Sequence, residues 1–401
     1  MSLLDAAEAQ ALLADSRLAP ADLTSCQGRL ATFLRRYIPF FYRKELRQNL
    51  KVVVRGMLSD VERKSCEPLA YREGLERKPI QAFVGRGHWQ DDAVMAELRG
   101  HVAEVLGNPD GLLIFDGSAF PKKGTESCGV ERQWCGRLGK VENCQMGVFL
   151  IYSTDEAWAP LDRQLYLPKD WARDAERRRK THVPSGVQFR TKCEIALALL
   201  DRSGRKISHS WVLGDDDFGR IATFRSALRK RGERYLLDVP GRTTIRDLEH
   251  PPPQAKRVAP FIRASQWAER YAAKRWERFT VRPAAKGPLE IEACTVRVRA
   301  KLGQRIGPEE RLVVLRTTEQ EPRIAFELTN AGMDVPLAEL VRVACQRHDI
   351  EELFEAAKGE TGLDHYEVRS WVGWHHHVTL SLLALWFLIL ERQRLGKKRQ
   401  L

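Results

Sequence analysis

The chain has 401 residues, and its 66 Lys and Arg exceed its 53 Asp and Glu, giving a formal net charge of +13. Such a surplus favours a polyanionic partner such as nucleic acid, although a basic protein with a solvated surface fits the charge equally well. The content of 43% hydrophobic and 30% charged residues is that of a soluble globular protein. The eight cysteines form no CxxC pair, which argues against a structural zinc site and a secreted disulfide framework.

Neither a signal peptide nor a membrane span is predicted. The first 20 residues lack the basic and apolar segments of a signal peptide. The longest apolar run, residues 378–390, is shorter than the ~20 residues that span a bilayer, so it predicts a buried core helix. We therefore expect a soluble, cytoplasmic protein.

Residues 1–108 are predicted to be helical, because apolar residues recur three and four apart and strand-like alternation is absent. We interpret this stretch as an N-terminal DNA-binding domain. Its basic residues recur along the predicted helices, but a solvated helix face explains them equally well. These residues are Arg35, Arg36, Arg43, Lys44, Arg47, Lys51 and Arg55.

A turn signal at residues 108–111 marks a change of pattern. The residues beyond it, 109–248, predict an α/β domain with a mixed sheet, because three strands precede alternating helices and strands. The predicted strands are 112–116, 144–154, 159–168, 208–215 and 234–240, and the predicted helices are 191–204 and 222–232.

Residues 249–332 are predicted to be an all-β insertion. Three consecutive prolines exclude regular structure within residues 250–260. A short helical stretch around Trp267 and Trp276 follows, and then alternating strands at 291–301, 310–318 and 323–330. Helices resume at Leu337, and residues 333–401 complete the α/β domain.

Three carboxylates are candidates for catalysis. Asp116 and Asp215 each end a predicted strand, where a side chain can project into a site; singly, such residues are more often turn or helix-cap residues. A predicted helix at 344–359 places Arg347, Glu351 and Lys358 within about 40° of one another. A carboxylate between two cations can stay ionised beside a phosphate, whereas a surface ladder of ion pairs is the alternative.

Four motifs occur in one order: D-G-S-A-F-P-K-K-G (116–124), L-Y-L-P-K-D-W (165–171), D-D-D-F-G (215–219) and R-x3-E-x6-K (347–358). With these motifs the chain resembles the DDE transposases of the bacterial insertion sequence 701 family, within the group that carries a Tyr-Arg-Glu-Lys signature. The resemblance extends through Y-E-V-R-S-W (366–371). It implies an RNase H-like fold, in which two central strands and a helix bring three carboxylates together.

The resemblance assigns Asp116, Asp215 and Glu351 as catalytic residues and metal ligands. Phe218 and Gly219 complete the motif that selects the first aspartate of 215–217, and the Arg and Lys spacing selects Glu351 over its neighbour. The implied cofactor is a pair of Mg²⁺ ions, or Mn²⁺, which would activate the attacking oxygen and stabilise the leaving one. The signature's tyrosine is absent, because Ala344 stands three residues before Arg347.

The implied function is DNA transposition: cleavage at terminal inverted repeats and strand transfer to target DNA, with a homodimer in the synaptic complex. The alternatives are a catalytically impaired DNA-binding relative or repressor, and a nuclease without strand transfer. Base stacking by either tryptophan has core packing as its alternative, and the run 375–377 is expected to be structural because consecutive helical histidines splay apart. Expected DNA contacts are Arg347, Lys358, Lys122, Lys123, Trp267, Trp276 and the run Arg177–Lys180.

Overall fold

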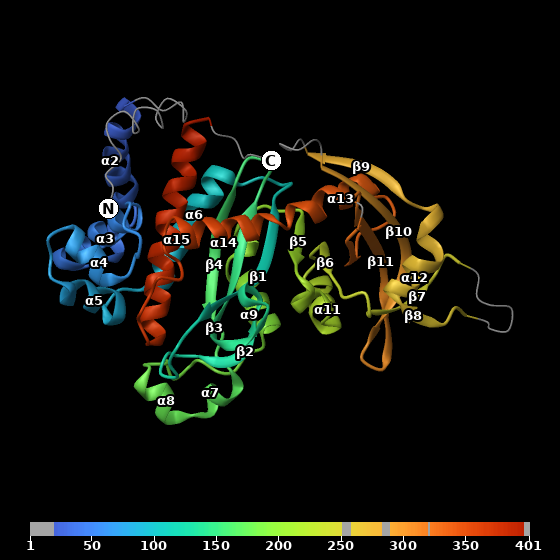
Figure 1. Cartoon of the computed structure of the whole chain (residues 1–401), viewed down its shortest axis with the longest axis horizontal. Coiled ribbons are helices and arrows are strands. Elements are labelled where there is room, and N and C mark those ends of the chain that lie inside the picture. The colour runs from blue at the N-terminus through green and yellow to red at the C-terminus, as the bar shows by residue number, and fades with distance from the viewer. Residues whose placement is uncertain (1–19, 251–257, 283–288, 320, 397–401) are drawn as a thin grey trace.

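The computed structural model describes residues 20–250, 258–282, 289–319 and 321–396 (Figure 1). The predictions for residues 1–19, for the proline-rich residues 251–257 and for the C-terminal residues 397–401 lie outside the described residues.

The N-terminal part of the chain is helical over its described residues, as predicted. Helices α3, α5 and α6 pack against α15 (Trp371–Arg394); α15 lies between α3 to α5 and the sheet, whereas α6 also packs against β4 (Trp158–Leu165) (Figure 1). Helix α3 shows why: Val53, Val54 and Met57 of its apolar face are buried, whereas Lys44 and Arg55 are exposed. The bounds of these elements are α2 (Pro20–Arg35), η1 (Ile38–Phe40), α3 (Lys44–Met57), α4 (Cys66–Arg72), α5 (Arg77–Arg86) and α6 (Asp91–Leu106).

A mixed sheet forms the centre of the molecule, in agreement with the predicted α/β class. Strand β1 pairs antiparallel with β3 and parallel with β5, and β5 pairs parallel with β6. Strand β4 adds to the far side of β3, also antiparallel. The bounds are β1 (Leu112–Pro121), β3 (Lys140–Ser153), β4 (Trp158–Leu165), β5 (Trp211–Gly214) and β6 (Tyr235–Asp238).

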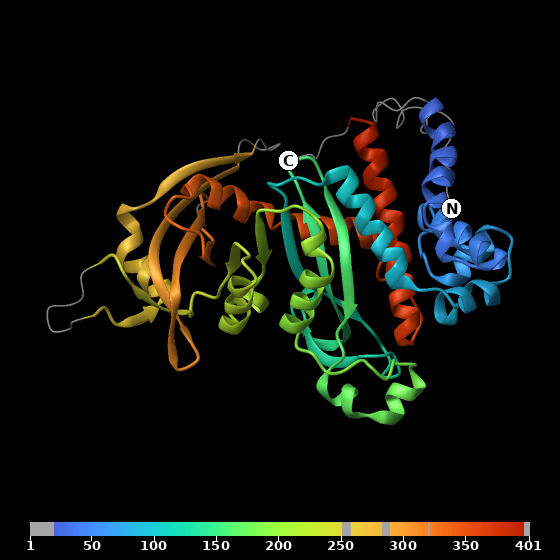
Figure 2. The same cartoon turned by 180° about the vertical axis from the view of Figure 1, so that it is seen from behind.

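Helices cover both faces of this sheet. Helices α13 (Leu337–Gln346) and α14 (Asp349–Gly359) cross the face seen in Figure 1, and α9 (Lys192–Arg202) and α11 (Ala222–Lys230) lie on the face seen in Figure 2. The short elements are β2 (Glu131–Cys135), η2 (Gly136–Leu138), α7 (Lys169–Arg173), α8 (Ala175–Lys180), η3 (Gly204–Lys206) and α10 (Asp216–Gly219).

The region predicted as a separate all-β insertion continues the central sheet, because β12 pairs with β6. The short helix predicted around Trp267 is α12, and the Trp267 side chain lies in a second, smaller core. The elements of this region are β7 (Thr244–Asp247), β8 (Phe261–Arg263), α12 (Ala264–Tyr271), η4 (Ala272–Lys274), β9 (Glu277–Arg282), β10 (Leu289–Leu302), β11 (Arg305–Thr317) and β12 (Ile324–Thr329).

Helix α15 is long and apolar enough to cross a membrane by length and composition, and it is the one helix of the described chain that meets this test. In the structure 89% of its apolar window is buried against protein. It is therefore a core helix, as predicted from the apolar run within it.

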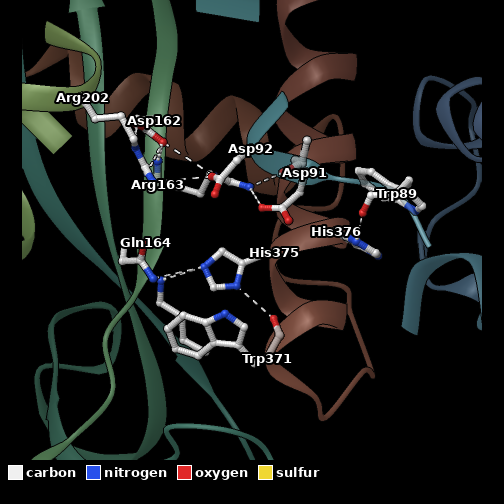
Figure 3. Close-up of polar contacts among 12 residues, drawn as sticks. Trp89, Asp91, Asp92, Asp162, Arg163, Gln164, Arg202, Trp371, His375 and His376 are labelled. Atoms are coloured by element: carbon white, nitrogen blue, oxygen red, sulfur yellow. Dashed lines mark hydrogen bonds and ion pairs between the residues drawn. The ribbon is translucent and has the colours of Figure 1, made fainter. Parts of the chain in front are cut away.

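A buried ion network joins the N-terminal helices to the sheet (Figure 3). Asp162 on β4 accepts hydrogen bonds from Arg202 Nε and Nη2, both at 2.8 Å. The neighbouring Arg163, which is completely buried, pairs with Asp91 and Asp92 at the start of α6. Since these residues come from α6, α9 and β4, the network fixes the helical part of the chain against the central sheet.

Candidate active site

Four carboxyl groups lie at one level of the sheet, on four neighbouring strands. Phe115 of β1 is in register with Gly214 of β5, which is in register with Leu237 of β6. The next residue on each strand is an aspartate: Asp116, Asp215 and Asp238. Glu327 of β12 pairs directly with the last of these. Residues at the same level of a sheet project from the same face, so these side chains form a row.

The row carries more negative charge than its surroundings neutralise. Burial, and then the charge of Asp215, raises the pKa of Asp116 to about 8. Burial, and then the neighbouring Asp217 and Asp216, raises the pKa of Asp215 to about 6. Burial also raises the pKa of Asp238, and burial with the charge of Asp238 raises that of Glu327 well above its usual range. Such a site favours the binding of a cation or a proton.

Arg347 is the cation nearest this row. Its Nε lies 3.0 Å from Asp238 Oδ2, and its Nη1 lies 3.6 Å from Glu351 Oε1. Its positive charge opposes the rise in pKa of all four carboxyl groups in the row, but does not cancel it. The arginine predicted to contact phosphate is thus engaged in ion pairs within the protein.

The single helix predicted for residues 344–359 is in fact two helices. Arg347 caps the end of α13 and His348 caps the start of α14. Both residues keep helical backbone angles, so the four-residue spacing still brings Arg347 beside Glu351. Ala344, at the position of the missing tyrosine, packs against the main hydrophobic core.

Glu351 reaches the site from α14 but is held by its own helix. Its Oε2 lies 3.0 Å from His348 Nδ1, and this hydrogen bond lowers the pKa of Glu351. The charge of Glu351 nevertheless raises the pKa of Asp116, which places the two within electrostatic reach. Glu352, by contrast, accepts a hydrogen bond from Trp158 Nε1 at 3.3 Å.

The donors fit a hard divalent cation in their chemistry, since carboxylate oxygens are its preferred ligands. No three His, Cys, Asp or Glu side chains of the described chain lie close enough to share one ion. Glu351 is paired with Arg347 and His348, and Asp116 Oδ1 accepts a hydrogen bond from Gly117 N at 2.6 Å. Asp215 caps α10, accepting from Asp217 N at 3.1 Å. Convergence on one ion therefore requires Glu351 to leave its cationic partners.

The predicted lysine contacts differ in their exposure. Lys122 Nζ donates to the Tyr366 carbonyl at 3.1 Å and lies 3.5 Å from the centre of the Tyr366 ring. Burial lowers the pKa of Lys122 to about 8. Lys122 is therefore partly buried against Tyr366, whereas Lys123 is exposed. Burial also lowers the pKa of Lys358, which lies within electrostatic reach of Asp116.

The base-stacking prediction is wrong for Trp267. This side chain is fully buried, and its Nε1 donates to Asp247 Oδ2 at 2.6 Å, so the core-packing alternative holds. The Trp276 ring is partly buried and lies 4.3 Å from the Arg316 guanidinium. In the basic run 177–180, Arg177 stacks on Trp171 at 3.7 Å, while Arg179 and Lys180 are exposed.

The three consecutive histidines of α15 are structural, as predicted (Figure 3 shows the first two). His375 Nδ1 lies 2.9 Å from the Trp371 carbonyl, and His377 Nε2 lies 2.8 Å from the Gly362 carbonyl. His376 bonds the carbonyls of α5 and of the segment that follows it. All three are buried and point to different partners, so they do not converge on one ion.

Acidic side chains at one level of adjacent strands, with cations beside them, are the type of site that metal-dependent nucleases use. The chain belongs to the DDE superfamily endonucleases, since the model of that family matches residues 36–299, about two thirds of the chain. The chain is also 25% identical over 187 residues to a "Probable transposase for insertion sequence element IS701" of Microchaete diplosiphon. That alignment covers 46% of each protein, so the chain spans about half the length of this curated relative. The resemblance predicted from the motifs is confirmed.

The family match includes Asp116 and Asp215 and ends before Glu351. Sequence reasoning did not identify Asp238 and Glu327 as members of the acidic row. Asp238 lies within the predicted strand 234–240, and the structure shows that the strand ends at this residue. The signal for Glu327 was an isolated charge in the apolar strand of 323–330.

Proposed function

We propose that the chain is a DDE transposase of an insertion sequence, which cleaves DNA at terminal inverted repeats and transfers the strand to target DNA. The observation that carries this proposal is the pair Asp116 and Asp215, side by side on parallel strands and both with a raised pKa. The finer assignment to an RNase H-like fold is supported by antiparallel β4, β3 and β1 followed by parallel β5 and β6.

Asp116, Asp215 and Glu351 would hold Mg²⁺ or Mn²⁺. When bound, the metal activates the attacking oxygen and stabilises the leaving one. The two aspartates must give up the protons that their raised pKa values favour, and Glu351 must turn from Arg347 and His348 toward them. Because β1 and β5 are held in a buried sheet, the aspartates stay in place while the glutamate moves.

Contacts to the DNA would come from exposed cations around this site and from the N-terminal helices. Lys123, Arg179 and Lys180 are exposed, and they would contact phosphate oxygens. On the helical part, a cleft of about 900 Å³ includes Arg86 and the largely exposed Tyr42 among its lining residues. A homodimer would bring two DNA ends together.

The second candidate is a relative that binds DNA ends without cutting them. The observation that favours it is Ala344, which packs in the core at the position of the signature's tyrosine. The two candidates share their DNA substrate and differ in cleavage.

A cleavage assay separates these candidates. The purified chain is given duplex DNA with its element's terminal inverted repeats, with Mg²⁺ or Mn²⁺, and strand-specific cuts that leave a 3′-OH are expected. Asp116→Ala, Asp215→Ala and Glu351→Ala should each reduce cleavage by on the order of a thousandfold while DNA binding persists. Glu352→Ala is the matched control and should cut normally. Specific binding without cleavage in either metal would establish the second candidate instead.

A further inference from the structure

Asp238 lies beside the candidate catalytic residues without belonging to the motifs that identify them. It is the last residue of β6 and follows Leu237, which is in register with Gly214 just before Asp215. Its side chain is three-quarters buried. An aspartate here is costly, because it adds a further carboxylate to an acidic row and burial raises its pKa. Its contacts indicate what offsets that cost.

Asp238 holds Arg347 from one side and is itself held from the other. The carboxylate Oδ2 lies 3.0 Å from Arg347 Nε, the shortest ion pair that this arginine makes in the described chain. Glu327, which is 4% exposed and in register with Asp238, hydrogen-bonds to it from β12. A buried, neutral carboxyl group can donate to its charged neighbour, and such a bond fixes the direction of the Asp238 side chain.

Arg347 has a second carboxylate within reach, and that carboxylate is a candidate metal ligand. Its Nη1 lies 3.6 Å from Glu351 Oε1. A guanidinium and a divalent ion compete for the same carboxylate oxygens, because both are attracted by the same charge. Loss of the charge on Asp238 would leave Glu351 as the nearest paired carboxylate of Arg347, and the arginine would then occupy an oxygen that the metal requires.

We propose that Asp238, supported by Glu327, is a positioning residue: it holds Arg347 in the 3.0 Å ion pair and so keeps the arginine's contact with Glu351 at the longer distance of 3.6 Å, from which a divalent cation at Asp116, Asp215 and Glu351 can displace it. This inference rests on the metal site of the proposed function. In this arrangement Arg347 is bound by the protein's own acidic row, chiefly by Asp238. Asp238 influences the affinity of the site for metal and takes no part in the chemical step.

Metal binding to the full chain without DNA tests the proposal. Calorimetric titration with Mn²⁺ at pH 7.5 should show about tenfold weaker binding in Asp238→Asn than in the wild type. In Asp238→Asn/Arg347→Gln, affinity should return to within about twofold of Arg347→Gln alone, because the competing cation is gone. Asp238→Glu, which keeps the charge, should restore most of the affinity. Glu352→Gln removes a charge elsewhere on α14 and is the matched control.

Glu327 gives a graded version of the same test. Glu327→Gln keeps a hydrogen-bond donor toward Asp238, so it should weaken Mn²⁺ binding less than Glu327→Leu does. Circular dichroism of each variant during thermal unfolding identifies any general loss of structure, which the double variant would not repair.

Two results would overturn the proposal. One is Mn²⁺ affinity in Asp238→Asn within twofold of the wild type, and the other is a loss that persists after Arg347 is removed. Absence of any Mn²⁺ binding by the wild type would remove the metal site and this inference together. A wild-type chain that binds Mn²⁺ and does not cut DNA would contradict the proposed function and leave the role of Asp238 intact.

Discussion

Two regions of this molecule contain a buried or partly buried aspartate of the same sheet, Asp162 in one and Asp116 in the other, and the pKa shifts in opposite directions. In the ion network of Figure 3, Asp91, Asp92 and Asp162 face Arg99, Arg163 and Arg202. In the acidic row, four carboxyl groups and Glu351 lie within electrostatic reach of one arginine, Arg347. Burial acts on both regions, and it is the largest influence on Asp162 as on Asp116.

The balance of nearby charge decides the outcome. The three arginines outweigh burial at Asp162 and lower its pKa, and Arg163 does the same at Asp91. At Asp116 and Asp215 the neighbouring carboxylates add to burial, and the pKa of each rises. A network with matched charges stabilises the fold by itself. The unmatched negative charge of the row favours the binding of a proton or of a cation, and a preference for cations is what a catalytic metal site requires.

The largest expected effect is on the ion network. Asp162→Asn leaves the buried Arg99 and Arg163 and the partly exposed Arg202 without their shared partner, so the free energy of unfolding should fall by about 3–5 kcal/mol. Asp92→Asn is the control from the same network, because its side chain is 69% exposed and its contacts are 3.4 Å or longer. It should cost less than about 1 kcal/mol. Equal losses in both variants, measured by chemical denaturation, would show that the network does not distinguish buried from exposed charge.

A divalent cation should act on the acidic row and leave the ion network unaffected. At a concentration one hundred times its dissociation constant, Mn²⁺ should stabilise the wild type by about 2.7 kcal/mol, because it binds the folded state. The melting temperature should therefore rise with Mn²⁺. Asp116→Ala should abolish this rise, and Asp92→Asn should keep it. A rise that survives in Asp116→Ala would place the ion elsewhere.

The comparison also shows how much the sequence predicted. Asp116 and Asp215 were identified because each was predicted to end an apolar strand; Asp215 directly follows β5, whereas β1 continues past Asp116 to Pro121 and only its parallel pairing with β5 ends before Asp116. Glu351 came from helical spacing, which survives the break between α13 and α14 because both capping residues keep helical angles. The mixed sheet and the helices followed from periodicity.

What the sequence did not predict depends on contacts between distant strands. Glu327 joins the row because β12 returns to pair with β6, a pairing between segments about 90 residues apart that no local pattern indicates. Trp267 was placed on a DNA surface, although its indole bonds Asp247 inside a small core. Lys122 and Arg347, which were predicted to contact phosphate, also have partners within the protein that are far away in sequence, the Tyr366 carbonyl and Asp238.

Removing a charge from the acidic row should raise the free energy of unfolding, whereas removing a charge from the ion network should lower it. In the absence of metal, Asp116→Asn relieves repulsion from Asp215 and should stabilise the chain by about 1 kcal/mol at pH 8, as substitutions at strained active sites often do. Chemical denaturation in the presence of a chelator measures this difference, and Asp162→Asn in the same experiment gives the reverse. Destabilisation by Asp116→Asn would mean that the row is balanced without metal.

The smallest expected effect is the pH dependence of that difference. The folded-state pKa of Asp116 is raised to about 8, above its unfolded value near 4, so the stability it contributes is present at low pH and is lost as pH rises toward 8. Asp162 and Asp91 have lowered pKa values, so their contribution is lost only as pH falls below about 4 and stays constant above it. Of these two regions, only the acidic row therefore changes its contribution to stability between pH 5 and pH 8.

Without metal, the stability advantage of Asp116→Asn over the wild type should grow by a few tenths of a kcal/mol or more per pH unit from pH 5 and level off above about pH 8. Denaturation at five pH values in chelator measures this trend. Saturating Mn²⁺ should remove the pH dependence that Asp116 gives to the stability of the wild type, because the ion replaces the proton on the row. A difference that stays constant with pH would show that Asp116 is ionised throughout, and the contrast between the two regions would then rest on geometry alone.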